Sequence, residues 1–381
     1  MKIRLFYHSV VSDWNHGNAH FLRGIVTELV ERGHDVAVLE PEDGWSIRNL
    51  REEHGDAPVA AFHGAFPHIR VERYHGHRDD IAKWVSDADL VIVHEWTEAG
   101  VVEQLTTARR KYPFVLFFHD THHRLVTDRQ SMPAHDFHAF DGVLAYGDVL
   151  RDLYLSEDLV ARAWTWHEAA DTQIFRPYPT VGYDGDLVWV GNWGDDERTE
   201  ELMEFLVEPV RVLGLKARVY GVRYPEEARR ALADAGIEYA GWLPNFDVPH
   251  VFSRFKVTLH VPRRPYVRAL PGIPTIRPFE ALACGLPLIC SPWRDVEGLF
   301  SAGRDFLIAR DGSEMRRTLA HLVSDAEARR SLAAHGLSTV LARHTCGQRV
   351  EQLLAIYTQA FVTRLPLTPP LRRPRRAPVV L

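Results

Sequence analysis

The sequence predicts an α/β fold of two domains, each built on a parallel β-sheet. Three observations predict this fold. Short apolar runs are typical of buried strands, helical periodicity fills the stretches between them, and the alternation restarts about halfway along the chain. The length of 381 residues also fits two domains, at roughly 100–200 residues each.

The first forty residues contain the repeating unit. Residues 3–7 form an apolar run, residues 21–30 place apolar side chains at helical spacing, and Gly33 stands where a helix C-terminal glycine belongs. Residues 35–39 form the next apolar run. Two strands joined by a helix are parallel, so this is a Rossmann-like β-α-β unit. Further strands are expected at residues 90–93, 114–118 and 142–145.

A turn-rich stretch, residues 175–182, separates this series from a second one. Strands of the second series are expected at residues 187–190, 217–220, 257–260 and 288–290. We therefore expect an N-terminal domain over 1–170, a C-terminal domain over 171–345, and a helix over 346–364 that packs back on the first domain. The basic, proline-rich residues 365–381 predict a disordered tail. A single large sheet with an insertion is the alternative.

Composition excludes several classes of protein. Forty-five Lys and Arg against 51 Asp and Glu give a net charge of −6, which offers no general attraction to nucleic acid or anionic membranes. No apolar window is long enough to span a membrane, and His8 and Asp13 interrupt any signal-peptide core. Three cysteines without paired spacing favour a cytoplasmic protein.

Two common nucleotide motifs are missing. The glycine-rich dinucleotide fingerprint does not follow the first strand, and no P-loop is present, which disfavours a dehydrogenase or a P-loop NTPase. Instead, residues 188–194 form a strand that runs into Gly191 and Gly194, and a helix is expected to start near Arg198. Backbone amides at this turn and the Arg198 guanidinium are suited to a diphosphate, although Arg198 could also be a surface residue.

A second segment, residues 271–288, predicts a helix at the same crevice. Pro278 suits the first turn of this helix and Gly285 its exit. Glu280 then falls in the first turn, where it can accept both hydroxyls of a ribose or simply cap the helix. Arg277 is either a phosphate ligand or a buried partner of a carboxylate.

Three segments carry a resemblance to a known family. They are RGHDV at residues 32–36, EAADTQIFRP at 168–177 and FEALACGLP at 279–287. Their order and spacing resemble GT-B glycosyltransferases of family 4, the group-1 type, in particular the CgeB-like branch of spore-maturation proteins. The resemblance implies two Rossmann-like domains whose parallel sheets face each other across an interdomain cleft.

The resemblance also implies roles for matched residues. Glu280 would hold the donor ribose, Arg198 the diphosphate, and Trp242 and Leu243 would contact the base, while His119 would lie near the transferred sugar. Further expected donor contacts are Gly191, Asn192, Arg223, Arg263, Thr275 and Arg277. In the loop after the first strand, Asp13, Asn15, Gly17 and Asn18 are expected to face the donor phosphates and the acceptor.

The implied activity is transfer of a sugar from a nucleotide-diphosphate sugar, of UDP or GDP type, to an acceptor bound by the first domain. The family generally uses no metal or other cofactor and retains anomeric configuration. Asp120 and Glu168 are then secondary candidates for stabilising positive charge. If the reaction inverts, a base is required, and His16 or Asp13 is the better candidate.

Two departures from the family pattern keep alternatives open. Gly272 stands where many members carry a second glutamate. Asp195 and Asp196 adjoin the expected phosphate site, where their charge could be offset by Arg263, Arg264, Arg268 and Arg277. The alternatives are a nucleotide-sugar epimerase or hydrolase, and a non-catalytic sugar-nucleotide binder. A metal enzyme using the histidines and aspartates at 119–123 and 135–138 is a weaker one. No motif selects the donor sugar, the acceptor or the oligomeric state.

Overall fold

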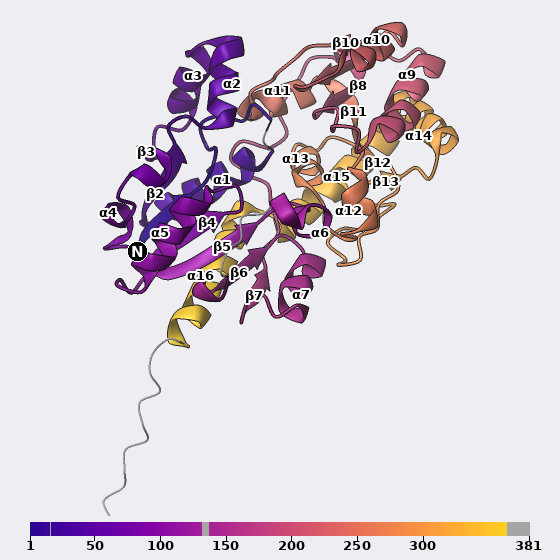
Figure 1. Ribbon diagram of the computed structural model, residues 1–381. Coiled ribbons are helices and arrows are strands. Elements are labelled where there is room, and N and C mark those ends of the chain that lie inside the picture. The colour runs from indigo at the N-terminus through magenta and orange to yellow at the C-terminus, as the bar shows by residue number, and fades with distance from the viewer. Residues whose placement is uncertain (16, 132–136, 364–381) are drawn as a thin grey trace, which may run out of the picture.

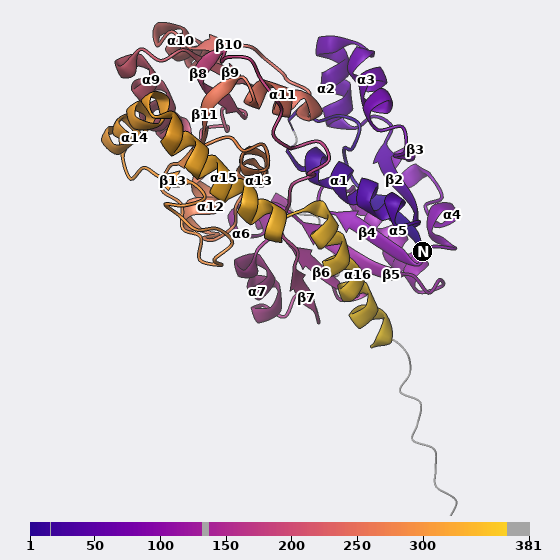
Figure 2. The same cartoon turned by 180° about the vertical axis from the view of Figure 1, so that it is seen from behind.

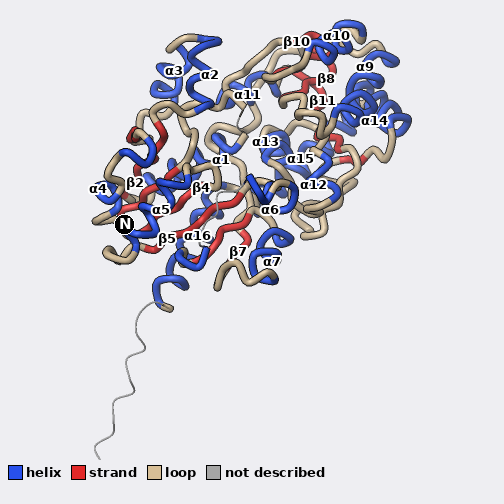
Figure 3. The backbone as a smooth tube through the Cα atoms, in the orientation of Figure 1, coloured by secondary structure: helices blue, strands red, loops and turns tan. Residues whose placement is uncertain are grey.

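The computed structural model describes residues 1–15, 17–131 and 137–363, which fold into two lobes, each with its own sheet (Figure 1). Both sheets are parallel throughout, as the apolar runs predict. Helices border the strands in each lobe (Figure 3).

The first sheet has seven strands in the order β3-β2-β1-β4-β5-β6-β7. Their bounds are β1 Lys2–Phe6, β2 Asp35–Pro41, β3 Val71–Tyr74, β4 Leu90–His94, β5 Val115–Asp120, β6 Gly142–Ala145 and β7 Ala163–Thr165. In the register, Ile3 pairs with Val36 on one side and with Leu90 on the other. The strand order reverses between β1 and β4, and ligands of such sheets bind beyond the strand ends at this point.

The second sheet has six strands in the order β10-β9-β8-β11-β12-β13. Their bounds are β8 Gly185–Val190, β9 Ala217–Tyr220, β10 Glu238–Tyr239, β11 Phe255–His260, β12 Leu288–Cys290 and β13 Leu307–Ile308. Here the order reverses between β8 and β11. The loops after these two strands contain the glycine turn near Arg198 and the arginines that follow residue 260.

Helices of the first lobe are α1 Asn18–Glu31, α2 Trp45–His54, α3 Ala57–Ala65, α4 Ala82–Val85, α5 Ala99–Arg109, α6 Arg124–Thr127 and α7 Asp148–Ser156. Those of the second are α8 Thr199–Leu202, α9 Glu208–Leu213, α10 Glu226–Asp234, α11 Val248–Phe252, α12 Arg264–Arg268, α13 Ile276–Ala283, α14 Gly312–Ser324 and α15 Ala326–Arg343. Between α8 and α9 the chain forms one π-helical turn, Met203–Val207.

The last helix, α16 (Cys346–Val362), leaves the second lobe and packs against α1 of the first (Figure 2). Thr345 caps it with a reciprocal capping box to Gln348. Directly before the helix, Thr345 lies opposite Ala170 in a parallel bridge, in which the Ala170 amide donates to the carbonyl of His344 and the Cys346 amide donates to the carbonyl of Ala170. The two crossings between the lobes therefore lie side by side.

Two elements extend beyond their expected bounds, and both differences change the site. Strand β5 continues to Asp120, so His119 is a strand residue rather than the first residue of a loop. Helix α13 begins at Ile276, two residues before Pro278, so Glu280 is its fifth residue rather than a member of the first turn. In the described ranges, no helix is both long and apolar enough to cross a membrane.

Candidate active site between the two domains

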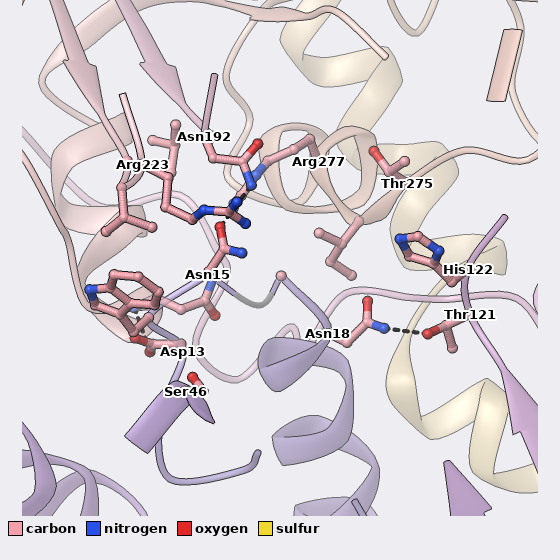
Figure 4. Close-up of a pocket in the computed structure, with 18 of the residues that line it drawn as sticks. Asp13, Asn15, Asn18, Ser46, Thr121, His122, Asn192, Arg223, Thr275 and Arg277 are labelled. Atoms are coloured by element: carbon pink, nitrogen blue, oxygen red, sulfur yellow. Dashed lines mark hydrogen bonds between the residues drawn. The ribbon is translucent and has the colours of Figure 1, made fainter. Parts of the chain in front are cut away.

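A cavity of about 800 Å³ lies between the carboxyl ends of the two sheets. Loops after six strands of the first sheet and four of the second supply its walls. Figure 4 shows Asn15, Asn192 and Arg277 facing one another in its middle. The sequence-predicted residues that line it are Asp13, Asn15, Gly17, Asn18, Glu168, Gly191, Asn192, Arg198, Arg223, Trp242, Leu243, Arg263, Thr275 and Arg277.

Arg198 is the partly buried cation at the centre of the second domain's wall. Its Nη1 donates to the carbonyl of Val261 at 2.8 Å, and its Nη2 donates to the carbonyl of Asn192 at 2.7 Å. Its Nε has no hydrogen-bond partner among the described residues, and no described carboxylate forms an ion pair with the guanidinium. Burial, and next the charge of Arg263, lower the pKa of Arg198 to about 9.

The turn before α8 is shaped to hold this side chain. Gly194 has φ of +99°, and a Cβ there would come within 2.8 Å of Arg198 Cγ. Only glycine adopts this conformation freely and leaves the arginine its space. Asn192 bonds to two arginines, since its Oδ1 accepts a hydrogen bond from Arg198 at 3.0 Å and another from Arg263 at 3.2 Å.

The other three arginines in the cavity wall each have an acidic partner. Arg263 pairs with Glu197 at 2.8 Å. Burial alone would raise the pKa of the Glu197 carboxyl, but the charge of Arg263 helps to lower it to about 2. Arg223 pairs with Asp195 at 2.9 Å, so Asp195 does not stand as an uncompensated charge beside the anion site. Arg277 pairs with Glu280.

Glu280 itself does not line the cavity. Its carboxylate is fully buried, and one oxygen accepts from His20 and from Asn245, both at 2.9 Å. The second oxygen is taken by Arg277. The extra helical residues before Pro278 rotate Glu280 inward, so a ribose reaches this carboxylate only if Arg277 turns away. In this structure the Glu280 carboxylate is therefore not open to the cavity, and its contact with a donor ribose stays a prediction.

His119, expected beside the transferred sugar, and Asp120, a secondary candidate for stabilising positive charge, are buried and do not line the cavity. His119 is buried, its Nδ1 contacts the Tyr7 hydroxyl at 2.6 Å, and burial lowers its pKa to about 3. Asp120 accepts from the Tyr154 hydroxyl at 2.8 Å, and burial raises its pKa to about 6. Both residues belong to β5, whose extension keeps them inside the lobe.

The histidine from this segment that reaches the cavity is His122, three residues later. Burial, then the neighbouring His123 and Arg124, lower its pKa to about 3, and its Nδ1 has no hydrogen-bond partner among the described residues. His8, which the sequence places near a strand end at the crevice, lines the cavity nearby. Trp96 and Tyr146 also line it and were not among the sequence candidates, and their positions after β4 and β6 were the signal that could have identified them.

Glu168 lines the cavity, with a side chain that is almost entirely buried. Its Oε1 has no hydrogen-bond partner in the described part of the chain. Burial, and next the charge of Glu280, raise the pKa of Glu168 to about 8. The carboxyl is therefore protonated at neutral pH and can donate a hydrogen bond into the cavity.

Residues of the first loop tie the two domains together. Asp13 pairs with Arg23 at 2.9 Å and accepts from Trp242 Nε1 at 3.1 Å and from the Asn245 amide at 2.9 Å. Both carboxylate oxygens of Asp13 are therefore engaged by partners in the free protein. Asn15 Oδ1 accepts from Asn192 at 2.8 Å. His16, the other candidate base, lies outside the described residues.

Three histidine–glutamate pairs span the same boundary, each with the histidine before residue 170 and the glutamate after it. His20 and Glu280 lie 2.9 Å apart, His167 and Glu297 2.9 Å, and His123 and Glu197 3.6 Å. Part of the high histidine content therefore serves contacts between the domains. No group of three or more potential metal ligands occurs among the residues with described positions. Two residues of the second histidine cluster, 135 and 136, fall outside them.

Comparisons with known proteins agree with this architecture. A family model described as "Glycosyl transferase-like" matches residues 198–355. The sequence matches no curated protein. Sucrose-phosphate synthase from Thermosynechococcus elongatus is similar in structure, with a TM-score of 0.65 and 14% identity over 95% of this chain and 100% of that one.

Two further structures share the arrangement. HepE of Anabaena, in complex with UDP and glucose, has a TM-score of 0.65 and 14% identity over 94% of this chain and 99% of its own. An alpha-glucosyltransferase in complex with UDP-glucose and DNA containing an abasic site has a TM-score of 0.71 and 11% identity, with coverage of 94% and 99%. The chain has the GT-B fold. Its cavity lies between the two domains of that fold.

Proposed function

We propose that this GT-B protein is a glycosyltransferase that uses a nucleotide-diphosphate sugar, with UDP as the first candidate and GDP as the second. The observation that carries the proposal is Arg198, a cavity-lining guanidinium with an unpartnered Nε and no acidic partner in the described structure. A partly buried cation of this kind is unfavourable in the free protein and is compensated by a bound anion. Two of the structural neighbours are complexes with UDP or UDP-glucose.

In this proposal, Arg198 binds the donor diphosphate and stabilises it as it leaves. Arg277 turns from Glu280 toward the phosphates, which frees the Glu280 carboxylate to accept the ribose hydroxyls. Trp242 and Leu243, which line the cavity near Asp13, provide contacts for the base. We also propose that the chain belongs to the CgeB-like branch of the group-1 family, which its sequence resembles.

The reaction breaks the bond between the sugar's anomeric carbon and the phosphate oxygen and forms one to an acceptor hydroxyl oxygen. The nucleoside diphosphate leaves with the bonding electron pair, and the acceptor hydroxyl loses its proton. For retention, we infer that the leaving phosphate takes this proton, because Asp13 is occupied by Arg23. Protonated Glu168 hydrogen-bonds a hydroxyl of the transferred sugar, and the packed domains exclude water.

A turnover assay tests the proposal. UDP-glucose, UDP-galactose and GDP-mannose are each incubated with the protein, with and without a mixture of acceptors, and nucleoside diphosphate release is measured. Acceptor-dependent release supports a transferase. Equal release without acceptor indicates a hydrolase, and donor binding without release indicates a binding protein. The anomeric proton coupling of the product distinguishes retention from inversion.

Glu168→Leu provides the matched test of the site. It keeps a side chain of similar volume but removes the hydrogen-bonding carboxyl, and we expect it to lower turnover while leaving UDP affinity within about twofold, since the contact is to the sugar. Glu351→Leu, on the exposed side of α16, is the control and leaves both quantities unchanged. Loss of UDP affinity in Glu168→Leu would contradict this placement of the sugar.

A further inference from the structure

An exposed tryptophan stands in the wall that the first domain contributes to the cavity. Trp96 follows β4, lines the cavity and leaves 44% of its surface accessible. Most large apolar side chains in this lobe are buried, so an accessible indole in a concave site points to a ligand. The arginines that line the cavity all come from the second domain.

The indole is held in position from behind. The Arg124 guanidinium lies 3.7 Å from the centre of the Trp96 ring, in a cation–π contact. Arg124 Nη2 lies 3.0 Å from Oε2 of the buried Glu95, whose pKa burial and the charge of Asp120 raise to about 8. One face of the ring therefore rests on a guanidinium that this carboxyl holds in place, and the indole presents a fixed apolar surface to the cavity.

A polar group beside this surface lacks a partner. His122 contacts the Trp96 ring edge-on, with centroids 5.5 Å apart, and its buried Nδ1 has no hydrogen-bond partner among the described residues. Thr121 and Asn18 lie next to it and bond to each other at 2.5 Å (Figure 4). A buried ring nitrogen without a partner is costly, which indicates that a ligand hydroxyl completes it.

The charge of this wall selects among ligands. No lysine or arginine of the described first domain lines the cavity, and its two acidic lining residues are Asp13, paired with Arg23, and Glu168. The pKa of His122, lowered to about 3, leaves that ring neutral at physiological pH. A phosphorylated, carboxylated or nucleic-acid acceptor would find no cation of the first domain to pair with.

From this geometry we propose that Trp96 and His122 form the acceptor subsite and that the acceptor is a neutral saccharide. The apolar face of a pyranose ring stacks on Trp96, and a ring hydroxyl bonds to His122 Nδ1. A flat phenol could stack in the same way but carries too few hydroxyls for the polar groups around it. The inference rests on the proposed function and names the class of its acceptor.

The test is binding of the full-length protein to a glycan array that carries neutral, sialylated and phosphorylated saccharides, with and without UDP. Titration with 4-methylumbelliferone provides the phenolic probe. We expect neutral saccharides to bind, with affinity reduced at least about tenfold in Trp96→Ala and less in Trp96→Phe, which keeps a ring. His122→Phe keeps the ring contact, removes the nitrogen and also weakens saccharide binding.

Tyr183→Ala is the matched control. Tyr183 is an exposed aromatic residue with Arg329 5.8 Å from its ring centre, but it lies outside the cavity. Its loss leaves saccharide binding unchanged. UDP affinity, measured in parallel, distinguishes the acceptor subsite from the proposed donor site. The Trp96→Ala and His122→Phe variants should bind UDP as the unaltered protein does.

Three results would overturn the acceptor assignment. They are binding of UDP without binding of any neutral saccharide, preference for acidic or phenolic probes, and neutral saccharide binding that Trp96→Ala and His122→Phe leave intact. Saccharide binding that depends on Trp96 in a protein that fails to bind any nucleoside diphosphate would support the subsite and contradict the proposed donor chemistry.

Discussion

Replacement of Arg198 by glutamine removes the charge on which the donor site depends. In the free protein this guanidinium hydrogen-bonds only neutral oxygens, at 2.7 to 3.0 Å, and its Nε is unpartnered. Hydrogen bonds to charged groups contribute about 1.5–3 kcal/mol each. Loss of one such bond to a diphosphate weakens binding by about 10- to 150-fold, at 1.4 kcal/mol per tenfold change.

Isothermal titration with UDP, UMP and uridine measures this effect. We expect Arg198→Gln to weaken UDP binding by that factor and to leave uridine binding almost unchanged, because the nucleoside lacks the diphosphate. Arg264→Gln is the matched control, since Arg264 lies near the same loop, pairs with Glu201 at 2.9 Å and does not line the cavity. Unchanged UDP affinity in Arg198→Gln, or an equal loss in Arg264→Gln, would refute the reasoning.

Three further predictions concern the boundary between the domains. Between pH 5 and 8, Glu168 keeps a proton in the folded protein that it has lost in the unfolded chain, so the free energy of unfolding falls as the pH rises. We expect Glu168→Gln to reduce this dependence of stability on pH, as measured by thermal melting across that range. Gly17→Ala places a Cβ 2.8 Å from Ile276 Cγ2, and this contact separates the domains. We expect kcat to fall by a larger factor than the Kd of UDP rises. Glu280→Gln breaks the buried pair with Arg277 and lowers unfolding free energy by about 3–5 kcal/mol in urea.

Each of these predictions has a contrary result. A pH slope that survives in Glu168→Gln means that another group carries the titration. Equal changes in kcat and Kd for Gly17→Ala mean that the contact with Ile276 positions the donor rather than the domains. An unchanged urea midpoint for Glu280→Gln means that the buried pair contributes nothing net to folding.

The sequence predicts the strands well where burial on both sides makes them continuously apolar, as at 90–93 and 142–145. It misses β3, Val71–Tyr74, and β7, Ala163–Thr165, because these edge strands contain partly buried and polar residues. It also cannot show which strand residues point inward. A two-residue error at the end of β5 exchanges His119 for His122 as the histidine of this segment that lines the cavity.

Long-range pairings are the part of the site that sequence patterns do not contain. Glu280 matches a family motif, yet its partner His20 lies 260 positions away, and nothing near either residue signals the contact. The same holds for Trp96, whose role depends on Arg124 behind its ring and on the cavity in front. Spacing identifies residue types suited to a chemistry, but only the fold decides which of them share a surface.

The most direct test of the account is whether the cavity binds a nucleoside diphosphate. Thermal melting of the protein with UDP, GDP or uridine measures this. A nucleotide at about a hundredfold over its Kd stabilises the folded state by about 2.7 kcal/mol, enough to raise the Tm by several degrees. The account predicts such a rise with UDP or GDP, a much smaller rise with uridine, and loss of the diphosphate effect in Arg198→Gln. Equal melting temperatures with and without every nucleotide would contradict it.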